Sequence, residues 1–431
     1  MFNVFLQLTT AQQIILTLMT IVTILLGAFA MNWSLLTYLS IRGRNKNTEP
    51  PQIKKLPEVT IHIPVFNERN VAERIIKSCM NMDYPSDKMK IIVIDDSTDE
   101  TTEIVESFEK KYPRLIKVIH REDRTGFKAG ALQTALDVTE SDFVMIFDAD
   151  FVPSKDILRK LLPYMYLDEK VAFVQTRSSY LNKHQSWVTR STALAIDGYG
   201  LIDLRGRYSA NLLAHFSGTG GLFRCSAIRS VGGWSSETLA EDLDLSIKLQ
   251  LKGWKYVFLP KLTCPGEIPA TYKLLRKQQS RWAKGFAQCF KKHYRSIIKS
   301  PILSIFQKFE ALMLLATYFL APISILSLIL MPFYFSIFPI SFFFHDYWLT
   351  ILGPIASIFL VIIYVSPLLL YGTTIFELSE GRLDYKEMLN IAGIGALGAG
   401  TLLATSKATL EGFFNIYSPF ESTPKFGTVD S

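Results

Sequence analysis

Charge is missing from two long stretches of this sequence, and that absence excludes an ordinary soluble protein. Residues 1–41 contain no lysine or arginine. Within them, 13–38 form an apolar run longer than the ~20 residues that a membrane helix needs. The block 303–371 is also apolar and is long enough for at least two further spans. Its few charged or histidine residues are Lys308, Glu310, His345 and Asp346. We therefore expect a multi-pass integral protein of the cell membrane.

The basic residues that the first stretch lacks follow directly after it, at Arg42, Arg44, Lys46, Lys54 and Lys55. Because cytoplasmic flanks of membrane helices carry an excess of Lys and Arg, we expect the N-terminus outside and the chain from residue 41 in the cytoplasm. The apolar run is not typical of a removed signal peptide, since it has no short apolar core followed by a small-residue cleavage site.

Cysteine is scarce, and several cofactor motifs are absent. The four cysteines, at 79, 225, 264 and 289, lie in the part expected to be cytoplasmic and do not have zinc-ligand spacing. We expect reduced structural thiols. There is no G-K-[ST] phosphate loop, and no G-x-G-x-x-G follows the first expected strand, which argues against P-loop and dinucleotide-redox proteins.

The chain has a net charge of +7, and much of the excess of basic residues is concentrated in two segments. Basic residues concentrate at 42–55 and 273–299, and each run adjoins an apolar stretch. Anionic lipid headgroups and an anionic substrate account for such a distribution without nucleic acid.

The polar stretch 41–300 alternates strand-like and helix-like patterns, which predicts βαβ units and a mostly parallel sheet. The expected strands are 56–65, 90–94, 115–120 and the run ending at Phe147, and the expected helices are 67–80 (opened by Asn67), 100–111 and 126–136.

Three of these strands end in polar clusters: Asn67 and Glu68, Asp95 and Asp96, and Asp148 and Asp150. Carboxyl ends of parallel strands share one edge of a sheet, so the clusters should converge there. Alternation along an extended chain puts Asp148 and Asp150 on one side. Two carboxylates there suit Mg²⁺ or Mn²⁺ together with substrate phosphates. The alternative is an ordinary aspartate turn.

Two glycine-rich segments are each compatible with a ligand-binding loop or with an ordinary turn. Gly126 and Gly130 flank Lys128 at a helix start, where backbone N–H groups and a point charge would suit a pyrophosphate. A simple glycine turn with a solvated lysine is the alternative. Residues 218–221 either let the backbone approach a ligand closely or form a tight turn only.

Two further helices are expected after residue 240, the first opened by acidic residues and the second rich in basic residues. Glu241 and Asp242 open a helix expected to end near Gly253, either as acids favoured by the helix dipole or with one acting as a general base. Residues 271–299 predict one or two basic amphipathic helices at the membrane interface. Trp282 could be an interfacial anchor or the floor under a sugar ring.

Four motifs occur in order: Asp95-Asp96, Asp148-Ala149-Asp150, Glu241-Asp242 and Gln278-Gln-Ser-Arg281-Trp282. With them, residues 55–300 resemble the family 2 glycosyltransferases of GT-A fold, in the membrane-embedded group of cellulose, hyaluronan and mannan synthases. The resemblance implies an α/β GT-A domain with a mostly parallel sheet, inserted between transmembrane helices and supported by interfacial amphipathic helices.

The resemblance also implies roles for individual residues. Asp242 would be the catalytic base, and Asp148 and Asp150 would hold the metal. Nucleotide-sugar contacts would come from Pro64, Glu68, Asp96, Lys128, Asp148, Gln278, Arg281 and Trp282. Acceptor contacts would come from Gly218, Thr219, Gly220, Glu241 and Trp282. Ala240 stands where the family has threonine.

The segment Phe420 to Lys425 resembles the family's gating loop, with Phe420, Thr423 and Lys425 matching and Ser422 replacing valine. The alternative is a disordered tail. A gating loop must be cytoplasmic, which requires an odd number of spans. Either 303–335 and 346–371 are single spans and 390–414 lies at the interface or re-enters, or 303–345 holds two short spans and 390–410 crosses.

The expected organisation is therefore a membrane helix with a basic linker (1–45), a cytoplasmic GT-A domain (55–265), interface helices (266–300), a membrane region (301–415) and a cytoplasmic tail (416–431). The expected function is inverting, Mg²⁺- or Mn²⁺-dependent transfer of a hexose from UDP-glucose or GDP-mannose to a growing β-linked polysaccharide. Transfer of a single sugar to a membrane lipid is the alternative. A transporter or scaffold is a third hypothesis, disfavoured because the spans carry almost no charge.

Overall fold

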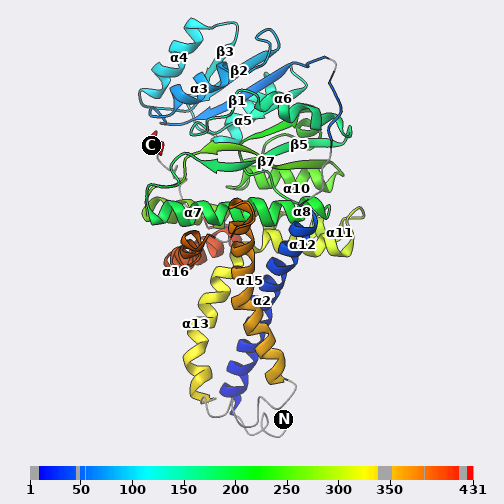
Figure 1. Ribbon diagram of the computed structural model, residues 1–431, viewed down its shortest axis with the longest axis vertical. Coiled ribbons are helices and arrows are strands. Elements are labelled where there is room, and N and C mark those ends of the chain that lie inside the picture. Colours follow the sequence, from blue (N-terminus) through cyan, green and yellow to red (C-terminus); the bar gives the residue numbers. More distant parts are fainter. Residues whose placement is uncertain are drawn as a thin grey trace.

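An α/β domain stands on a layer of helices from which long helices extend (Figure 1). The computed structural model describes residues 9–44, 49–53, 55–337, 352–382, 384–416 and 425–430.

The domain is built on a seven-stranded sheet of order β3-β2-β1-β4-β6-β5-β7. The strands are β1 (Val59–Val65), β2 (Met89–Asp95), β3 (Ile116–His120), β4 (Phe143–Ile146), β5 (Val171–Tyr180), β6 (Gly221–Arg224) and β7 (Lys255–Gly266). All neighbouring pairs are parallel except the two that involve β6. The predicted mostly parallel sheet is confirmed.

The antiparallel strand β6 brings the loop before it to the end of β4. Gly221, the first residue of β6, pairs with Ile146, the last residue of β4. The glycine-rich loop before β6 therefore meets the turn that follows β4.

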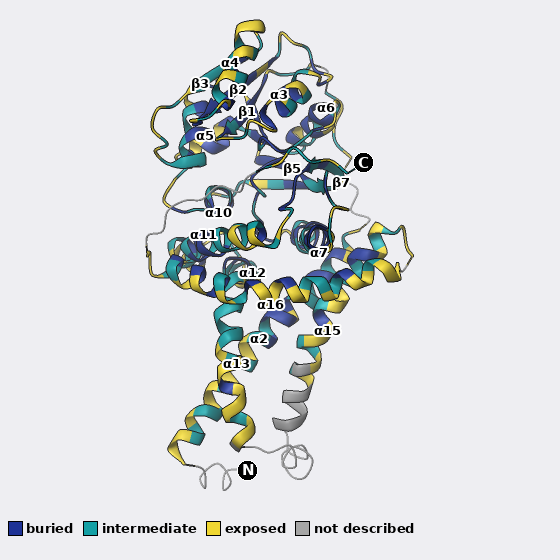
Figure 2. Cartoon of the chain, turned by 90° about the vertical axis from the view of Figure 1, so that its left-hand side faces the viewer, coloured by how far each residue is buried: buried dark blue, intermediate teal, exposed yellow. Residues whose placement is uncertain are grey.

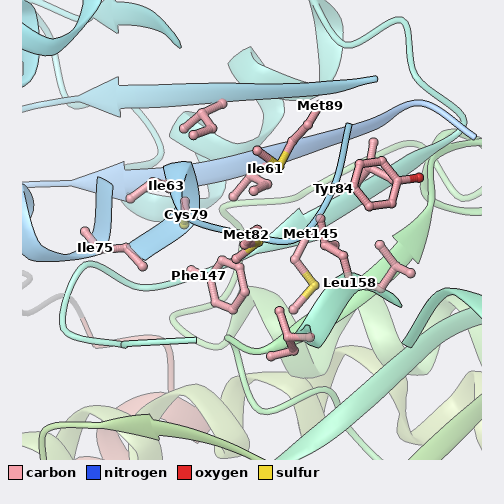
Figure 3. Close-up of a cluster of buried hydrophobic side chains, with 14 of the residues drawn as sticks. Ile61, Ile63, Ile75, Cys79, Met82, Tyr84, Met89, Met145, Phe147 and Leu158 are labelled. Carbon is pink, nitrogen blue, oxygen red and sulfur yellow. The ribbon is translucent and has the colours of Figure 1, made fainter. Parts of the chain in front are cut away.

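Apolar side chains on both faces of the sheet explain its burial. On one face Ile61 and Ile63 of β1 belong to a core that also contains Ile75 and Cys79 (Figure 3). On the other, Ile92 and Ile94 of β2 pack with alanines of the helix that follows β3. The first face is covered by α3 (Ala72–Met80), α4 (Thr101–Lys111) and α6 (Ile157–Leu161), and the second by α5 (Phe127–Asp137), α9 (Cys225–Ser230) and α10 (Glu241–Leu251).

One predicted helix start was wrong. Asn67 does not open a helix, because α3 begins at Ala72. Asn67 has a positive φ of 53° and its side-chain oxygen accepts from the Thr98 N–H at 2.8 Å. Its amide side chain thus ties together the loops after β1 and β2.

The supporting layer consists of helices at the base of the domain. α7 (Trp187–Gly198) continues through a π-helical stretch, η2 (Tyr199–Leu204), into α8 (Arg205–Ser209). α11 (Tyr272–Lys299) is a single helix, followed by α12 (Ile305–Leu315) and η3 (Thr317–Phe319). α16 (Tyr385–Phe413) packs on α11 and α7 and runs across the extending helices (Figure 2).

The extending helices are α2 (Thr10–Arg42), α13 (Leu320–Ile337) and α15 (Leu352–Leu378) (Figure 1). Together with α16 they give four helices, among the described residues, that are long and apolar enough to span a membrane. Their outward side chains are large and exposed, for example Ile14, Leu328, Ile329, Val361 and Leu368. Apolar surface of this extent is typical of contact with a membrane.

Candidate active site

Lys128 joins three segments at the carboxyl edge of the sheet. Its Nζ lies 2.6 Å from Asp148 Oδ1 and donates to the Gly218 carbonyl at 2.9 Å. The Asp148 N–H in turn donates to Thr219 Oγ1 at 3.0 Å. The start of α5, the turn after β4 and the glycine loop before β6 are therefore held together by one lysine and one aspartate.

The first turn of α10 meets the same point. Gly218 has a φ of +83°, and a Cβ there would lie 3.0 Å from Asp242 Oδ2. The glycine thus permits the close approach of the loop to Asp242. Glu241 Oε1 lies 3.6 Å from Lys128 Nζ. The structure brings together Asp148, Lys128, the glycine loop and both acids of α10.

Burial and mutual charge shift the acids of this cluster. Burial raises the pKa of Asp242, although Lys128 opposes the change. Burial also raises the pKa of Glu241, to about 7. The helix N-terminus moderates these shifts, since Asp242 Oδ1 accepts from the Leu243 N–H at 2.8 Å. For Lys128, burial opposes the charge, but the carboxylates of Asp148 and Glu241 outweigh it and raise its pKa.

Asp150 lies deeper and has a different partner. Its side chain is 3% exposed, and Lys425 Nζ lies 2.5 Å from its Oδ2. Burial raises the pKa of Asp150 and, together with the Asp150 charge, raises that of Glu68 to about 8. Arg74 donates to the Asp150 carbonyl at 3.1 Å and to Glu267 at 2.6 Å. Neither Arg74 nor Glu267 was predicted, because neither belongs to a motif.

The reason given for the Asp148–Asp150 pair was wrong. β4 ends at Ile146, so both aspartates lie in the following turn rather than alternating along a strand. Asp148 keeps a side chain that is 34% exposed. The turn, not strand alternation, presents one carboxylate outward and buries the other.

Asp96 is held at the end of β2 by an arginine that the sequence did not single out. Arg121 Nε and Nη2 donate to its two carboxylate oxygens at 2.7 and 2.6 Å. Nη2 of Arg121 also donates to the Phe127 carbonyl at 3.0 Å, next to Lys128. Arg121 thereby connects Asp96 to the loop that opens α5.

Pro64, also predicted to lie near the nucleotide, is half-buried on β1 and pairs in register with Ile94 of β2.

Asp95, the other acid of this motif, is structural. It is fully buried and accepts from Ser97 N, Thr102 Oγ1 and His120 Nδ1, at 3.0, 2.7 and 2.8 Å.

α11 carries the predicted Gln278, Arg281 and Trp282, all half-buried. Their spacing of three and four residues places them on one helix face. The Oε1 atom of Gln278 is buried without a hydrogen-bond partner among the described residues. The predicted contacts of these residues with substrate stay predictions.

Farther along, α11 supports α10 directly. α10 has no side-chain cap, since Ala240 stands at its start. Instead, Gln288 Oε1 accepts from the Leu239 N–H at 2.8 Å, and His293 Nε2 lies 2.7 Å from Asp244 Oδ1. α11 therefore fixes the loop and helix that present Asp242.

Of the predicted gating residues, Phe420 and Thr423 lie outside the described residues, whereas Lys425 is the partner of Asp150. The four cysteines are buried and free.

No group of three or more His, Cys, Asp or Glu in the described part of the chain could hold a metal ion by itself. A cation at Asp148 and Asp150 would therefore take further ligands from substrate phosphates, as Mg²⁺ commonly does. The residues fit such an ion, because the oxygen donors are hard and the Lys425 ammonium already stands beside Asp150 as a positive charge.

The sheet topology, with a lysine and acids at its carboxyl edge, is that of a GT-A glycosyltransferase domain. Residues 57–285 match the family described as "Glycosyltransferase like family 2". The chain belongs to this family.

Two plant glucomannan mannosyltransferases are among the curated relatives that the chain matches. The chain is 36% identical to glucomannan 4-beta-mannosyltransferase 1 of Oryza sativa subsp. japonica over 263 residues, 59% of this chain and 50% of that protein. It is 37% identical to glucomannan 4-beta-mannosyltransferase 9 of Arabidopsis thaliana over 259 residues, 58% and 49% respectively. The chain thus spans about half the length of these relatives.

A mannosyltransferase from Pyrobaculum calidifontis, solved in complex with GDP-Man and Mn²⁺, is similar with a TM-score of 0.55. It is 19% identical, and the match covers 91% of this chain and 100% of that one. At this identity the likeness confirms the predicted fold.

Proposed function

We propose that this chain is an inverting, membrane-bound hexosyltransferase that transfers mannose from GDP-mannose to a growing β-linked polysaccharide. The observation that carries the proposal is the convergence of Lys128, Asp148 and Asp242 around the Gly218 loop. The names of the curated relatives and the GDP-Man in the similar structure favour mannose over UDP-glucose, the other predicted donor.

In this reaction Asp242 accepts the proton of the acceptor hydroxyl as that oxygen attacks the anomeric carbon. Glu241 and the Gly218–Gly220 loop would border the acceptor. No covalent sugar–enzyme intermediate is needed for inversion.

On the donor side, Lys128 would neutralise charge that develops on the departing nucleoside diphosphate. Asp96 would bind the base, with Pro64 and Glu68 nearby. Gln278, Arg281 and Trp282 would hold the diphosphate and the acceptor sugar, so α11 would connect the donor site with the base-bearing helix.

A divalent cation, Mg²⁺ or Mn²⁺, would be held by Asp148 and Asp150 and would supply further charge neutralisation at the diphosphate. The oxygen donors of this pair and the Mn²⁺ in the similar structure support this proposal. EDTA should abolish transfer, and added Mn²⁺ or Mg²⁺ should restore it.

The arrangement of the long helices supports one of the two predicted topologies. α2, α13 and α15 would span the cell membrane, and α16 would lie at its cytoplasmic face (Figure 2). Three spans would separate the N-terminus from the domain and tail, and the basic residues after α2 favour a cytoplasmic domain and tail with the N-terminus outside. A protease-cleavable tag at either end of the chain tests this: protease added to intact cells should cut only the N-terminal tag.

Purified full-length protein in nanodiscs should be incubated with labelled GDP-mannose or UDP-glucose, followed by sizing and mass analysis of products. Polymer from GDP-mannose supports the proposal. The second candidate function is transfer of a single sugar to a membrane lipid, and the position of α11 against the membrane-side helix α16 favours it. A lipid product that carries one sugar would establish this function. Absence of transfer from either donor would refute the proposed function.

A further inference from the structure

Lys425 is the partner of a carboxylate that lies far from it in the sequence. Lys425 Nζ is 2.5 Å from Asp150 Oδ2, and the two side chains are 16% and 3% exposed. A buried carboxylate without a partner would be costly, so the lysine stabilises Asp150 in the substrate-free chain. This lysine therefore occupies Oδ2 of Asp150, one of the two oxygens through which the carboxylate could bind a metal ion.

The residues after Lys425 are held at the rim of the same site. We call residues 425–430 the strap. Asn70 Nδ2 donates to the Lys425 carbonyl at 3.0 Å, and the Phe426 N–H donates to Glu267 Oε2 at 3.2 Å. Asn70 precedes α3, and Glu267 directly follows β7.

The far end of the strap is anchored near the end of β5. The Asp430 N–H donates to the Leu181 carbonyl at 2.6 Å, and its carboxylate accepts from the His184 N–H at 2.7 Å. The ion pair with Asp150 is thus one of several contacts that seat the strap across three loops.

We propose that Lys425 competes with the divalent cation for Asp150. The inference rests on the cation site of the proposed function. One carboxylate oxygen cannot hold an ammonium at 2.5 Å and a divalent ion at about 2.0–2.1 Å together without strong repulsion between the two cations. Cation binding at Oδ2 therefore requires Lys425 to leave that oxygen.

The coupling is reciprocal, because two ligands that exclude one another weaken each other equally. Because Lys425 is docked for part of the time, the apparent cation affinity equals the intrinsic affinity multiplied by the fraction of chains whose Asp150 is available. A cation that arrives with the donor diphosphate releases the lysine, and departure of both lets the lysine return to Asp150. The strap thus makes stable cation binding conditional on the substrate.

The test measures binding of Mn²⁺ alone to the purified full-length protein, by the electron paramagnetic resonance signal of free Mn²⁺. Lys425→Met removes the ammonium but keeps an unbranched chain of similar length. Mn²⁺ affinity should rise about tenfold if Lys425 is docked about nine-tenths of the time. The matched control is Lys255→Met, which removes a lysine paired with Asp168 on the surface and should leave the affinity unchanged.

Asp150→Asn, alone and combined with Lys425→Met, assigns the binding to this site and should abolish the gain. If Asp150-dependent binding is equal in wild type and Lys425→Met, the competition is refuted while the cation site stands. If Mn²⁺ binding is insensitive to Asp150 in every variant, both the cation site and the competition are refuted. An increase in affinity that Asp150→Asn abolishes distinguishes competition at this site from altered folding.

A second measurement follows the lysine itself. Amine acetylation, quantified by mass spectrometry, should modify Lys425 several-fold faster in the presence of saturating Mn²⁺ and GDP than in their absence. Lys255 serves as the internal reference. An unchanged ratio of the two rates would overturn the proposed release.

Discussion

Three features of the surroundings act on the pKa of Asp242. Burial raises it, whereas the Lys128 charge and the backbone N–H of Leu243 lower it. A buried carboxylate whose charged form is stabilised by a nearby lysine suits proton abstraction from a sugar hydroxyl. The same neighbourhood contains Glu241, so the two acids of α10 affect one another.

Asp242→Asn tests the base directly. The amide cannot accept the acceptor proton, so we expect kcat to fall about 10²–10⁴-fold with little change in donor binding. Transfer of labelled sugar and GDP-mannose titration measure the two quantities. Asp168→Asn, at an exposed ion pair with Lys255, is the control. Unchanged kcat in Asp242→Asn would contradict the assignment.

The raised pKa of Asp242 predicts a pH dependence. The base must be deprotonated, so the rate should fall as pH decreases through a pKa above that of an ordinary aspartate. Lys128→Met removes the positive charge that opposes this shift, so the pKa of Asp242 should rise further and the acidic limb should move to higher pH. The measurement is kcat against pH for both proteins. A limb that moves to lower pH would exclude this electrostatic coupling.

At the scale of elements, α11 replaces a missing cap. Ala240 offers no side-chain oxygen to the start of α10, and α11 supplies Gln288 to the loop and His293 to Asp244. This requires α11 to approach the backbone closely. A Cβ on Gly285 would lie 2.8 Å from the Ala240 Cβ and 2.9 Å from its N.

Gly285→Ala should therefore displace the Ala240 loop or α11 and lower kcat about tenfold or more, since small errors in positioning a catalytic group are costly. Gly395→Ala in α16 is the matched control, because a Cβ there meets no atom within 4 Å. That variant should keep its activity, as alanine favours a helix over glycine. Equal activity of the two variants would show that the packing does not set the position of Asp242.

At the scale of the whole molecule, buried polar contacts join the domain to its membrane-side helices. Arg207 of α8, 1% exposed, pairs with Asp203 at 2.8 Å and with the fully buried Glu310 of α12 at 3.5 Å. Asn32 of α2 donates to Glu310 at 2.7 Å. The first long helix is thus attached to the base of the domain through hydrogen bonds and charge.

Arg207→Leu leaves Glu310 and Asp203 without their cation, and we expect a loss of about 3–5 kcal/mol in stability. Thermal unfolding in detergent measures the loss. The exposed pair of Arg69 with Glu100 provides the control, because Arg69→Ala should cost no more than about 1 kcal/mol. Similar shifts in both variants would refute a connecting role for the network.

Much of the fold could be predicted from local pattern. Apolar runs with β-branched residues gave β1, β2, β3 and β4, and uncharged stretches gave the long helices, because burial and membrane contact both select sequence composition. The acids at strand ends could be placed together, since parallel strands share an edge. The start of α3 was missed because Asn67, in positive-φ geometry, serves a turn between loops.

By itself, the sequence determined which segments form strands and long apolar helices, and which acids and glycines follow them. These depend on composition and period, which are local. Only the tertiary structure decided that Arg121 holds Asp96, that α11 supports the start of α10, that α16 lies across the other long helices, and that Lys425 pairs with Asp150. Each of these is a contact between segments distant in the chain, and its partner is selected by packing rather than by any pattern near it.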